Sequence, residues 1–158
     1  MKKTKYSALI SIFLIILLFG CQNGDSEKEM KLSTDIERGT KGYIGLSVYG
    51  KNGEIIIGGN FVSSDYKKDI SVADLLKDIG RELKIPVVVK VSFMGTYIEG
   101  INNLFEFEHG AQSGWIYFVN GESQGIGCDS YILQDGDYVE WRYTLDLGKD
   151  IGAYNLTE

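Results

Sequence analysis

The sequence has 158 residues, of which 44% are hydrophobic, and its formal net charge at pH 7 is −6. This length is enough for one domain with a real core and too short for two. An acidic chain without a basic patch argues against nucleic acid and against anionic lipid headgroups as ligands.

The first twenty residues predict a signal peptide. Three lysines lie before position 6, and residues 8–19 are apolar apart from one serine. This run is shorter than the roughly 20 residues of a membrane-spanning helix, and a charged start, a short apolar core and a small residue are typical of secretion signals. Leu18, Phe19 and Gly20 precede Cys21, which resembles the bacterial lipobox. We therefore expect a diacylglycerol group on Cys21; the alternative is an uncleaved membrane anchor with an incidental cysteine.

Residues 22–29 are polar without exception. They predict a lipidated, disordered tether over residues 21–40, a folded domain over residues 41–147 and a tail over residues 148–158. Two acyl chains suffice for stable anchoring, because each buried methylene contributes ~0.8 kcal/mol. The expected location is outside the cytoplasm, anchored to the bacterial cell membrane. Without the three lysines of the signal peptide, the net charge falls from −6 to −9.

An N-terminal hairpin comes first in the predicted domain. Residues 43–49 alternate between apolar and polar side chains, as in a strand with one buried face. Asn52-Gly53 tolerates the positive φ angles of a type I′ turn. Residues 54–58 then form the return strand.

The sequence clearly predicts one helix, which begins after Ser71. Ser71 is a good N-cap, and Asp74 follows three residues later. The apolar residues that follow share one helical face, and Pro86 ends the helix. Gly80 inside it costs about 1 kcal/mol relative to alanine, which suggests that the helix packs closely against a neighbour there.

The rest of the chain predicts strands and one long loop. The β-branched run at residues 87–91 predicts a central strand. Residues 94–114 are rich in aromatic residues but interrupted by glycine and asparagine, so we expect a loop that packs onto the domain or onto a ligand. Residues 115–119 and 138–143 predict two further strands, with Asn120-Gly121 as a hairpin turn after the first.

This order of elements predicts an α+β fold, a β-grasp-like mixed sheet with one helix packed on one face. In the strand at residues 115–119, Trp115 and Tyr117 share one face, while Ile116 and Phe118 share the other. One face meets the helix. The loop at residues 94–114 could cover the other face itself, or a ligand or partner could cover it.

Catalysis and metal binding find little support. Cys128 is the single thiol besides Cys21, and His109 is the single imidazole, but no nucleophile motif surrounds them. Burial is the common state of a free cysteine. Asp135 and Asp137 lack the ligand spacing of a calcium loop, and a structural zinc site needs about four cysteine or histidine ligands. We expect no enzyme, no metal and no cofactor.

Three blocks near the C-terminus carry a family resemblance. They read G-W-x-Y-x-V-N-G at residues 114–121, G-x-x-x-Y at residues 127–131 and D-G-D-x-V-x-W-x-Y at residues 135–143. This pattern resembles the C-terminal domain of transcobalamin and intrinsic factor, and the bacterial lipoprotein domains grouped as domain-of-unknown-function family 4430. The resemblance spans most of residues 43–145.

The resemblance implies a β-grasp domain that binds a ligand. In the vitamin carriers this domain closes over cobalamin from one side, and a separate helical barrel holds the other side. The present chain has no room for that barrel, so a corrinoid would need a second chain to complete its site. The family usually has a small residue such as alanine where Cys128 stands, and an exposed Cys128 could act as a cobalt ligand.

The expected ligand surface combines the loop at residues 95–103, the strand at residues 115–119 and the turn at residues 127–131. Aromatic faces there suit a flat macrocycle, and amide and carboxylate groups could fix its polar edge. The expected function is capture of a small molecule, such as cobalamin or another corrinoid, for uptake by a transporter. The alternative is a protein–protein interaction module of a cell-surface complex. The candidate ligand-binding residues are Tyr97, Asn102, Asn103, Trp115, Tyr117, Cys128, Asp129 and Tyr131.

Overall fold

The computed structural model describes residues 28–92 and 95–153. The expected signal peptide, Cys21 and the first part of the expected tether lie outside the described residues. Within this described part, no helix has the length and apolar character needed to cross a membrane.

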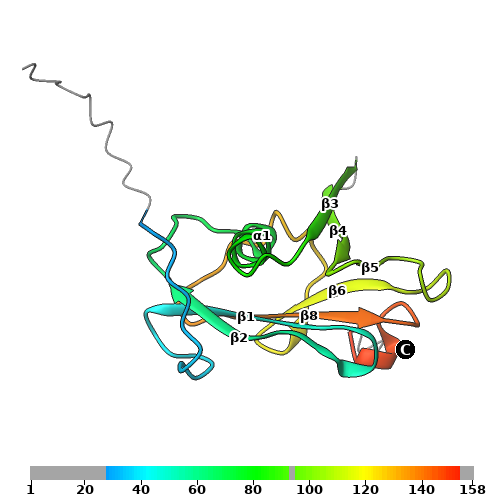
Figure 1. Cartoon of the computed structure of the whole chain (residues 1–158), viewed down its shortest axis with the longest axis horizontal. Helices are drawn as coiled ribbons and strands as arrows, with labels where there is room; N and C mark the ends of the chain where they lie inside the picture. Colours follow the sequence, from blue (N-terminus) through cyan, green and yellow to red (C-terminus); the bar gives the residue numbers. More distant parts are fainter. Residues whose placement is uncertain (1–27, 93–94, 154–158) are drawn as a thin grey trace, which may run out of the picture.

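Five strands form a mixed sheet in the order β2-β1-β8-β6-β7 (Figure 1). The central pair, β1 and β8, is parallel, and the other neighbours are antiparallel. The predicted strands at residues 43–49, 115–119 and 138–143 are thus present and lie side by side. The strands are β1 (Tyr43–Tyr49), β2 (Ile55–Ser63), β6 (Gly114–Val119), β7 (Glu122–Ser123) and β8 (Tyr138–Thr144).

Two short 3-10 helices flank this sheet. The first, η1 (Lys51–Gly53), joins β1 to β2, and both Asn52 and Gly53 have positive φ angles there, as the Asn-Gly pair predicts. The second, η2 (Lys149–Ile151), follows β8.

A second, antiparallel sheet contains β3 (Val87–Ser92), β4 (Gly95–Ile101) and β5 (Leu104–Phe105), in the order β3-β4-β5. It corrects two predictions. The segment expected as a loop contains β4 and β5, and β3 is an edge strand rather than a central one, because β4 is its one neighbour in the sheet.

The helix α1 (Val72–Glu82) begins and ends as its sequence predicts. The Ser71 hydroxyl oxygen accepts a hydrogen bond from the Asp74 N–H at 3.1 Å. At the other end Lys84 has φ 58°, and Ile85 N–H donates to the Gly80 carbonyl at 2.8 Å, which is a Schellman motif. A methyl group on Gly80 would lie 2.8 Å from Val87 Cγ2, so the predicted close packing of the helix at this glycine is confirmed.

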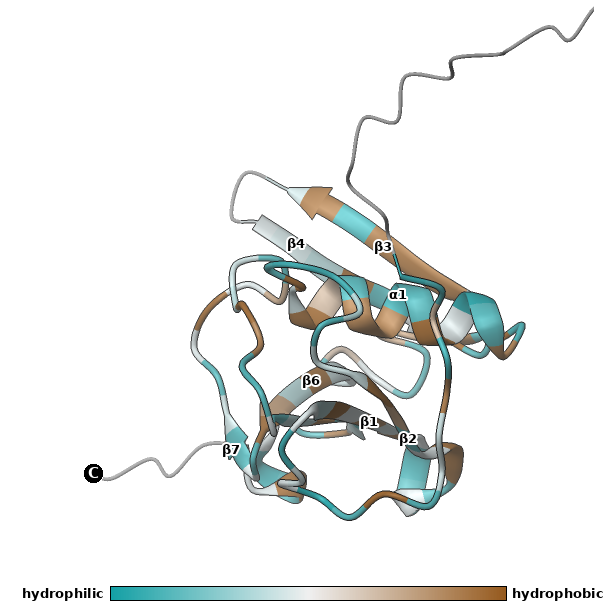
Figure 2. Ribbon diagram, turned by 90° about the vertical axis from the view of Figure 1, so that its left-hand side faces the viewer, coloured by the Kyte–Doolittle hydropathy of each residue, from teal (hydrophilic) through white to brown (hydrophobic). Residues whose placement is uncertain are grey.

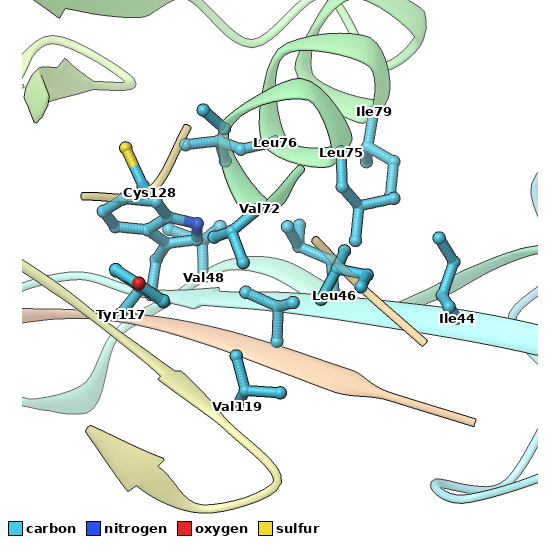
Figure 3. Packing of buried hydrophobic residues seen from close by; sticks show 14 of the residues in the cluster. Ile44, Leu46, Val48, Val72, Leu75, Leu76, Ile79, Tyr117, Val119 and Cys128 are labelled. Atoms are coloured by element: carbon cyan, nitrogen blue, oxygen red, sulfur yellow. The ribbon is translucent and has the colours of Figure 1, made fainter. Parts of the chain in front are cut away.

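The hydrophobic core lies on one side of the five-stranded sheet. Both α1 and the three-stranded sheet cover this side (Figures 1 and 2). Figure 3 shows the apolar face of α1 pointing toward β1 and β6. Within the described residues, the Nε1 atom of Trp141 is the one buried side-chain nitrogen or oxygen without a hydrogen-bond partner. The buried core includes Ile44, Leu46, Val48, Val72, Leu75, Leu76, Ile79, Ile98, Ile101, Tyr117, Val119, Cys128, Val139 and Trp141.

Two arginines cover part of the opposite face of this sheet. The guanidinium of Arg142 lies 4.2 Å from the ring centroid of Phe118, and that of Arg38 lies 4.0 Å from the ring centroid of Tyr138. Between them lies Glu140, which is 4% exposed and bonds both arginines. The expectation that the loop at residues 94–114 covers this face is therefore wrong, because that segment packs on the core side.

Residues 28–40, which we call the strap, lie against the domain. Ser33 exchanges two backbone hydrogen bonds with Phe61, at 2.9 and 2.8 Å. Met30 and Leu32 pack against the hydrophobic core. The structure differs here from the disordered tether expected up to residue 40, because these two apolar side chains and the Ser33 bridge attach the segment to the sheet.

Candidate functional site

Two neighbouring hollows lie between β4 and β6, and we call them together the β4–β6 groove. The narrow hollow has a volume of about 180 Å³ and the wide hollow about 490 Å³. They share the residues Tyr97, Ile98, Trp115 and Ile116. The wide hollow falls within the ~300–1,000 Å³ common for ligand sites.

The groove lies where two strands run without a neighbour on one side. β6 pairs with β7 only through its last two residues, and β4 pairs with β5 only through Gly100 and Ile101. The first part of each strand therefore presents an unpaired edge. The short length of β5 and β7 creates this opening between the two sheets.

Four of the predicted ligand-binding residues line the narrow hollow: Tyr97, Trp115, Tyr117 and Cys128. Their polar atoms already have partners within the protein. Tyr97 donates a hydrogen bond to Glu106 at 3.2 Å, and the Trp115 indole donates to the carbonyl of Leu104 at 2.9 Å. These side chains are therefore fixed in place with their carbon surfaces toward the groove.

Tyr117 and Cys128 are neutral at physiological pH. The Tyr117 hydroxyl donates to the carbonyl of Ile126 at 2.8 Å, and the Cys128 thiol donates to the carbonyl of Thr96 at 3.3 Å. Burial, helped by the charge of Asp129, raises the pKa of Cys128 to about 11. Burial also raises the pKa of Tyr117 well above its ordinary value.

The other four predicted residues do not line the groove. Asn102 and Asn103 form the two-residue turn between β4 and β5, with φ angles of 51° and 63°. Asp129 is exposed beside the narrow hollow, and its hydrogen bonds with Thr96 lower its carboxyl pKa. Tyr131 packs against the core with its ring 6.3 Å from that of Tyr117.

Seven further residues line the narrow hollow that were not among the predicted ligand-binding residues. Ile98 and Trp141 line it from the core, and Ile126 lies at the surface with 53% of its area exposed. The position of Ile126 between Gly125 and Gly127 could have indicated a role in the hollow, because an apolar residue in a glycine-rich turn needs an apolar contact. Ile98 was hidden in a segment interpreted as a loop.

The wide hollow has apolar neighbours that solvent reaches. Phe107 and Leu147 both line it, with 61% and 55% of their areas exposed. The loop of Phe107 is held by Ser113, whose hydroxyl oxygen accepts hydrogen bonds from the His109 N–H and the Tyr143 hydroxyl. The Leu147 N–H, from the loop after β8, donates to the Gln112 carbonyl at 3.0 Å. Large exposed apolar side chains on a rigid loop mark a surface that contacts a ligand or partner.

No hydrogen bond joins Cys128 to His109 in the described part of the chain. The imidazole of His109 lies 3.4 Å from the Lys51 amine and meets the ring of Tyr143 edge-on. Residues 28–92 and 95–153 also contain no group of three histidine, cysteine, aspartate or glutamate side chains placed to hold a metal ion.

A larger hollow of about 630 Å³ lies at the opposite face, beside η1 and η2. Its charged residues are already paired: Arg142 bonds Glu140 and the carbonyl of Ile151, and Asp150 bonds Thr144 and the N–H of Leu145. The groove is the better candidate because four of the predicted ligand-binding residues line it and none lines this larger hollow.

Comparisons with known proteins find a similar family and similar folds. Residues 71–144 match the family described as Domain of unknown function (DUF4430). A candidate metal-binding protein from Ruminococcus gnavus ATCC 29149 shares the fold with a TM-score of 0.50 and 16% identity, over 65% of this chain and 95% of its own. Haptocorrin, solved in complex with Cbi, matches with a TM-score of 0.54 and 18% identity, over 68% of this chain. This match spans 26% of the haptocorrin chain. No curated protein sequence matches the chain.

Proposed function

We propose that the chain is a non-enzymatic binding module that captures a small molecule in the β4–β6 groove. The premise of this proposal is that the chain carries a DUF4430 domain of transcobalamin-like fold. The observation that carries this proposal is the groove itself. Its walls combine two unpaired strand edges with Tyr97, Trp115 and Tyr117, whose polar atoms are satisfied internally.

We further propose that the fold is a β-grasp arrangement. One helix crosses one face of a mixed sheet whose central strands, β1 and β8, are parallel. The family match begins at Ser71, so the hairpin of β1 and β2 lies outside it. In this proposal the hairpin completes the sheet against which α1 packs.

A corrinoid is the ligand to test first. The sequence resembles the transcobalamin C-terminal domain, and haptocorrin with Cbi has the same fold. Neither hollow encloses a macrocycle, so a corrinoid would lie across the rims, over Tyr97 and Trp115. A transporter or a second binding chain would then supply the other half of the site. A corrinoid that lies across the rims, partly exposed, fits the open face of the groove.

The location follows from the expected anchor. We propose that the mature chain stands outside the cytoplasm, held to the cell membrane by a lipid on Cys21. Two acyl chains are enough for stable attachment. A binding module held there would pass its ligand to a membrane transporter.

Protein–protein recognition is the second candidate function. Unpaired strand edges can accept a strand from a partner, and the groove exposes Phe107, Ile126 and Leu147 around its rim. In that case a partner protein would protect these three side chains, and no small molecule would stabilise the domain.

The decisive experiment is calorimetric titration of the purified chain with cyanocobalamin and cobinamide, with thermal unfolding in parallel. We expect saturable heat that Trp115→Ala and Tyr97→Ala abolish. Tyr49→Ala is the matched control, because Tyr49 is an aromatic residue of β1 beside the opposite hollow. Absence of heat and of a thermal shift at millimolar ligand would rule out corrinoids, and retention of binding by both groove variants would rule out the groove.

A further inference from the structure

Two apolar residues of the wide hollow have an unusual backbone conformation. Phe107 has φ 63° and Leu147 has φ 47°, so both lie in the left-handed region. The other non-glycine residues with positive φ in the described part of the chain are four asparagines, one aspartate and one lysine. Asparagine and aspartate tolerate this region, whereas a bulky apolar side chain there costs free energy. Backbone strain of this kind is concentrated at functional sites.

Hydrogen bonds from the surrounding loops maintain this conformation. The Phe107 N–H donates to the Ser113 carbonyl at 2.9 Å, and the Gly110 N–H donates to the Phe107 carbonyl at 3.3 Å. The Leu147 N–H donates to the Gln112 carbonyl, which joins the loop after β8 to the loop before β6. The backbone therefore fixes both residues at the wide hollow, which both of them line.

The domain itself makes little use of these two side chains. Neither is part of the hydrophobic core or of the partly buried residues that pack against it. Phe107 leaves 61% and Leu147 leaves 55% of its area exposed. An asparagine at either position would form the same turn with less strain. The apolar side chains are therefore best explained by a contact outside the domain.

The two loops that carry this pair are acidic. Residues 104–113 and 144–150 contain four carboxylates and one lysine, which gives a net charge of −3 when the histidine is counted as neutral. The carboxylates belong to Glu106, Glu108, Asp146 and Asp150. Phe107 has an acidic residue on each side in the sequence, and Leu147 directly follows one. Negative charge thus surrounds the apolar pair.

Nearby lysines neutralise this charge only in part. The amine of Lys90 lies 3.9 Å from the carboxylate of Glu106, and that of Lys149 lies 3.8 Å from the carboxylate of Asp146. Pairs of this length with exposed lysines contribute little. Lys51 approaches an imidazole rather than a carboxylate. A cation from a partner would therefore meet carboxylates beside the apolar pair.

The position of the two loops favours a protein over the membrane as partner. In Figure 1 the strap begins at the left of the molecule, and the loops after β5 and β8 form its right-hand end. A chain attached through Cys21, as proposed, would present these loops away from its attachment point. Their negative charge is also unfavourable beside anionic lipid headgroups.

We infer that Phe107 and Leu147 form a docking surface for a partner protein that presents an apolar side chain flanked by lysine or arginine. The apolar side chain would lie against this pair in the wide hollow of about 490 Å³, and the flanking cations would face the carboxylates of the two loops. A protein interface has such an apolar centre and polar rim. This docking surface goes beyond the proposed capture of a small molecule and does not depend on it; it gives a second chain a place beside the groove.

The test uses peptides of defined charge as probes. Acetyl-Lys-Leu-Phe-Leu-Lys-amide carries the proposed chemistry, and acetyl-Glu-Leu-Phe-Leu-Glu-amide has the same apolar part with the opposite charge. Each is titrated into the ¹⁵N-labelled chain, and the amide signals of Phe107, Gln112 and Leu147 report binding. We expect saturable shifts with the lysine peptide and binding about tenfold weaker with the glutamate peptide. Acetyl-Lys-Ser-Gly-Ser-Lys-amide, which lacks the apolar part, should give no saturable shift.

Two asparagine variants separate docking from stability. Asparagine tolerates the left-handed conformation, so Phe107→Asn and Leu147→Asn should each unfold at a higher urea concentration than the wild type. Each should nevertheless bind the lysine peptide about tenfold more weakly, because an apolar contact is lost. Ile55→Asn is the matched control, since Ile55 lies on β2 with 68% of its area exposed. It should leave peptide binding unchanged.

Four results would overturn the docking surface. Two concern the peptides: equal binding of the two charged peptides, or full binding of the lysine peptide by both asparagine variants. A dimer in sedimentation that Phe107→Asn dissociates would assign the surface to a second copy of the chain. Attachment to phosphatidylcholine vesicles that the same variant abolishes would assign it to lipid.

The proposed function fails separately. If the lysine peptide binds as expected but corrinoids give no heat, the docking surface stands and the corrinoid is the wrong ligand. If a corrinoid binds the chain and the lysine peptide does not, the small-molecule function stands and the docking surface is wrong.

Discussion

The guanidinium of Arg38 in the strap lies 2.8 Å from the carboxylate of Glu140 on β8. Partial burial is the largest single effect and lowers the pKa of Arg38, but the charge and hydrogen bond of Glu140, together with Tyr138 and Tyr49, outweigh it and raise the pKa above its ordinary value. A segment expected to be a disordered tether is therefore fixed to the centre of the sheet by an ion pair.

Glu140→Gln should lower the free energy of unfolding by about 1–2 kcal/mol, because it removes a buried carboxylate that bonds two arginines, both of which solvent still reaches. Chemical denaturation measures this loss. Glu54→Gln, at an exposed glutamate of the N-terminal hairpin, should change stability by less than about 0.5 kcal/mol. Equal effects of the two substitutions would show that the pairs with Arg38 and Arg142 contribute nothing.

Gly80→Ala should destabilise the domain by about 1–3 kcal/mol, although alanine normally favours a helix over glycine by about 1 kcal/mol. The reason is the 2.8 Å approach of a Cβ at this position to Val87 Cγ2. Val87→Ala in the same chain should remove most of the cost, which a double-mutant cycle measures. Simple additivity of the two substitutions would contradict the proposed contact.

Lys84→Gly should stabilise the domain by about 1 kcal/mol, because Lys84 holds a left-handed conformation that glycine adopts without strain. Lys77→Gly is the matched control, since Lys77 lies inside α1. There the same change should cost about 1 kcal/mol. Urea denaturation of both variants should give shifts of opposite sign.

Alkylation of Cys128 by iodoacetamide should be slow in the folded chain and should keep accelerating up to about pH 11, since the thiolate forms only near that pH. Unfolded thiols titrate near 9.0. Folding raises the pKa of this acid, so the unfolded chain loses its proton first. The contribution of Cys128 to stability should therefore be constant below pH 9 and fall between pH 9 and about 11.

The measurement requires Cys21→Ser, which leaves Cys128 as the sole thiol. Denatured chain provides the fast reference rate. Rapid labelling of the folded chain at pH 7 would contradict the buried, neutral thiol, and it would reopen the question of a reactive cysteine.

Local signals predicted the single elements well. The cap at Ser71, the stop at Pro86 and the Asn-Gly turns each depend on a few neighbouring residues. The second sheet could not be predicted in this way. Its β5 has two residues, and its turn uses Asn102-Asn103, whose side chains were interpreted as ligand contacts although their positive φ angles give them a role in the backbone.

The groove was predicted in part. Tyr97, Trp115, Tyr117 and Cys128 meet around one hollow, as an aromatic surface from three segments would require. Trp141 alternates with charged neighbours in β8 and belongs to the hydrophobic core. Periodicity could not show that the same ring also reaches the groove, because this depends on how far β4 stands from β6.

If Cys21 carries the proposed lipid, the strap limits how far the domain can stand from the membrane. It begins at Lys28, seven residues after Cys21. Because an extended chain advances at most about 3.5 Å per residue, an anchor on Cys21 would allow a maximum distance of roughly 25 Å between the anchor and Lys28. A tether reaching residue 40 would allow almost three times that height. If the proposed lipid on Cys21 anchors the chain, a transporter or second chain that meets the β4–β6 groove must present its own site close to the lipid surface.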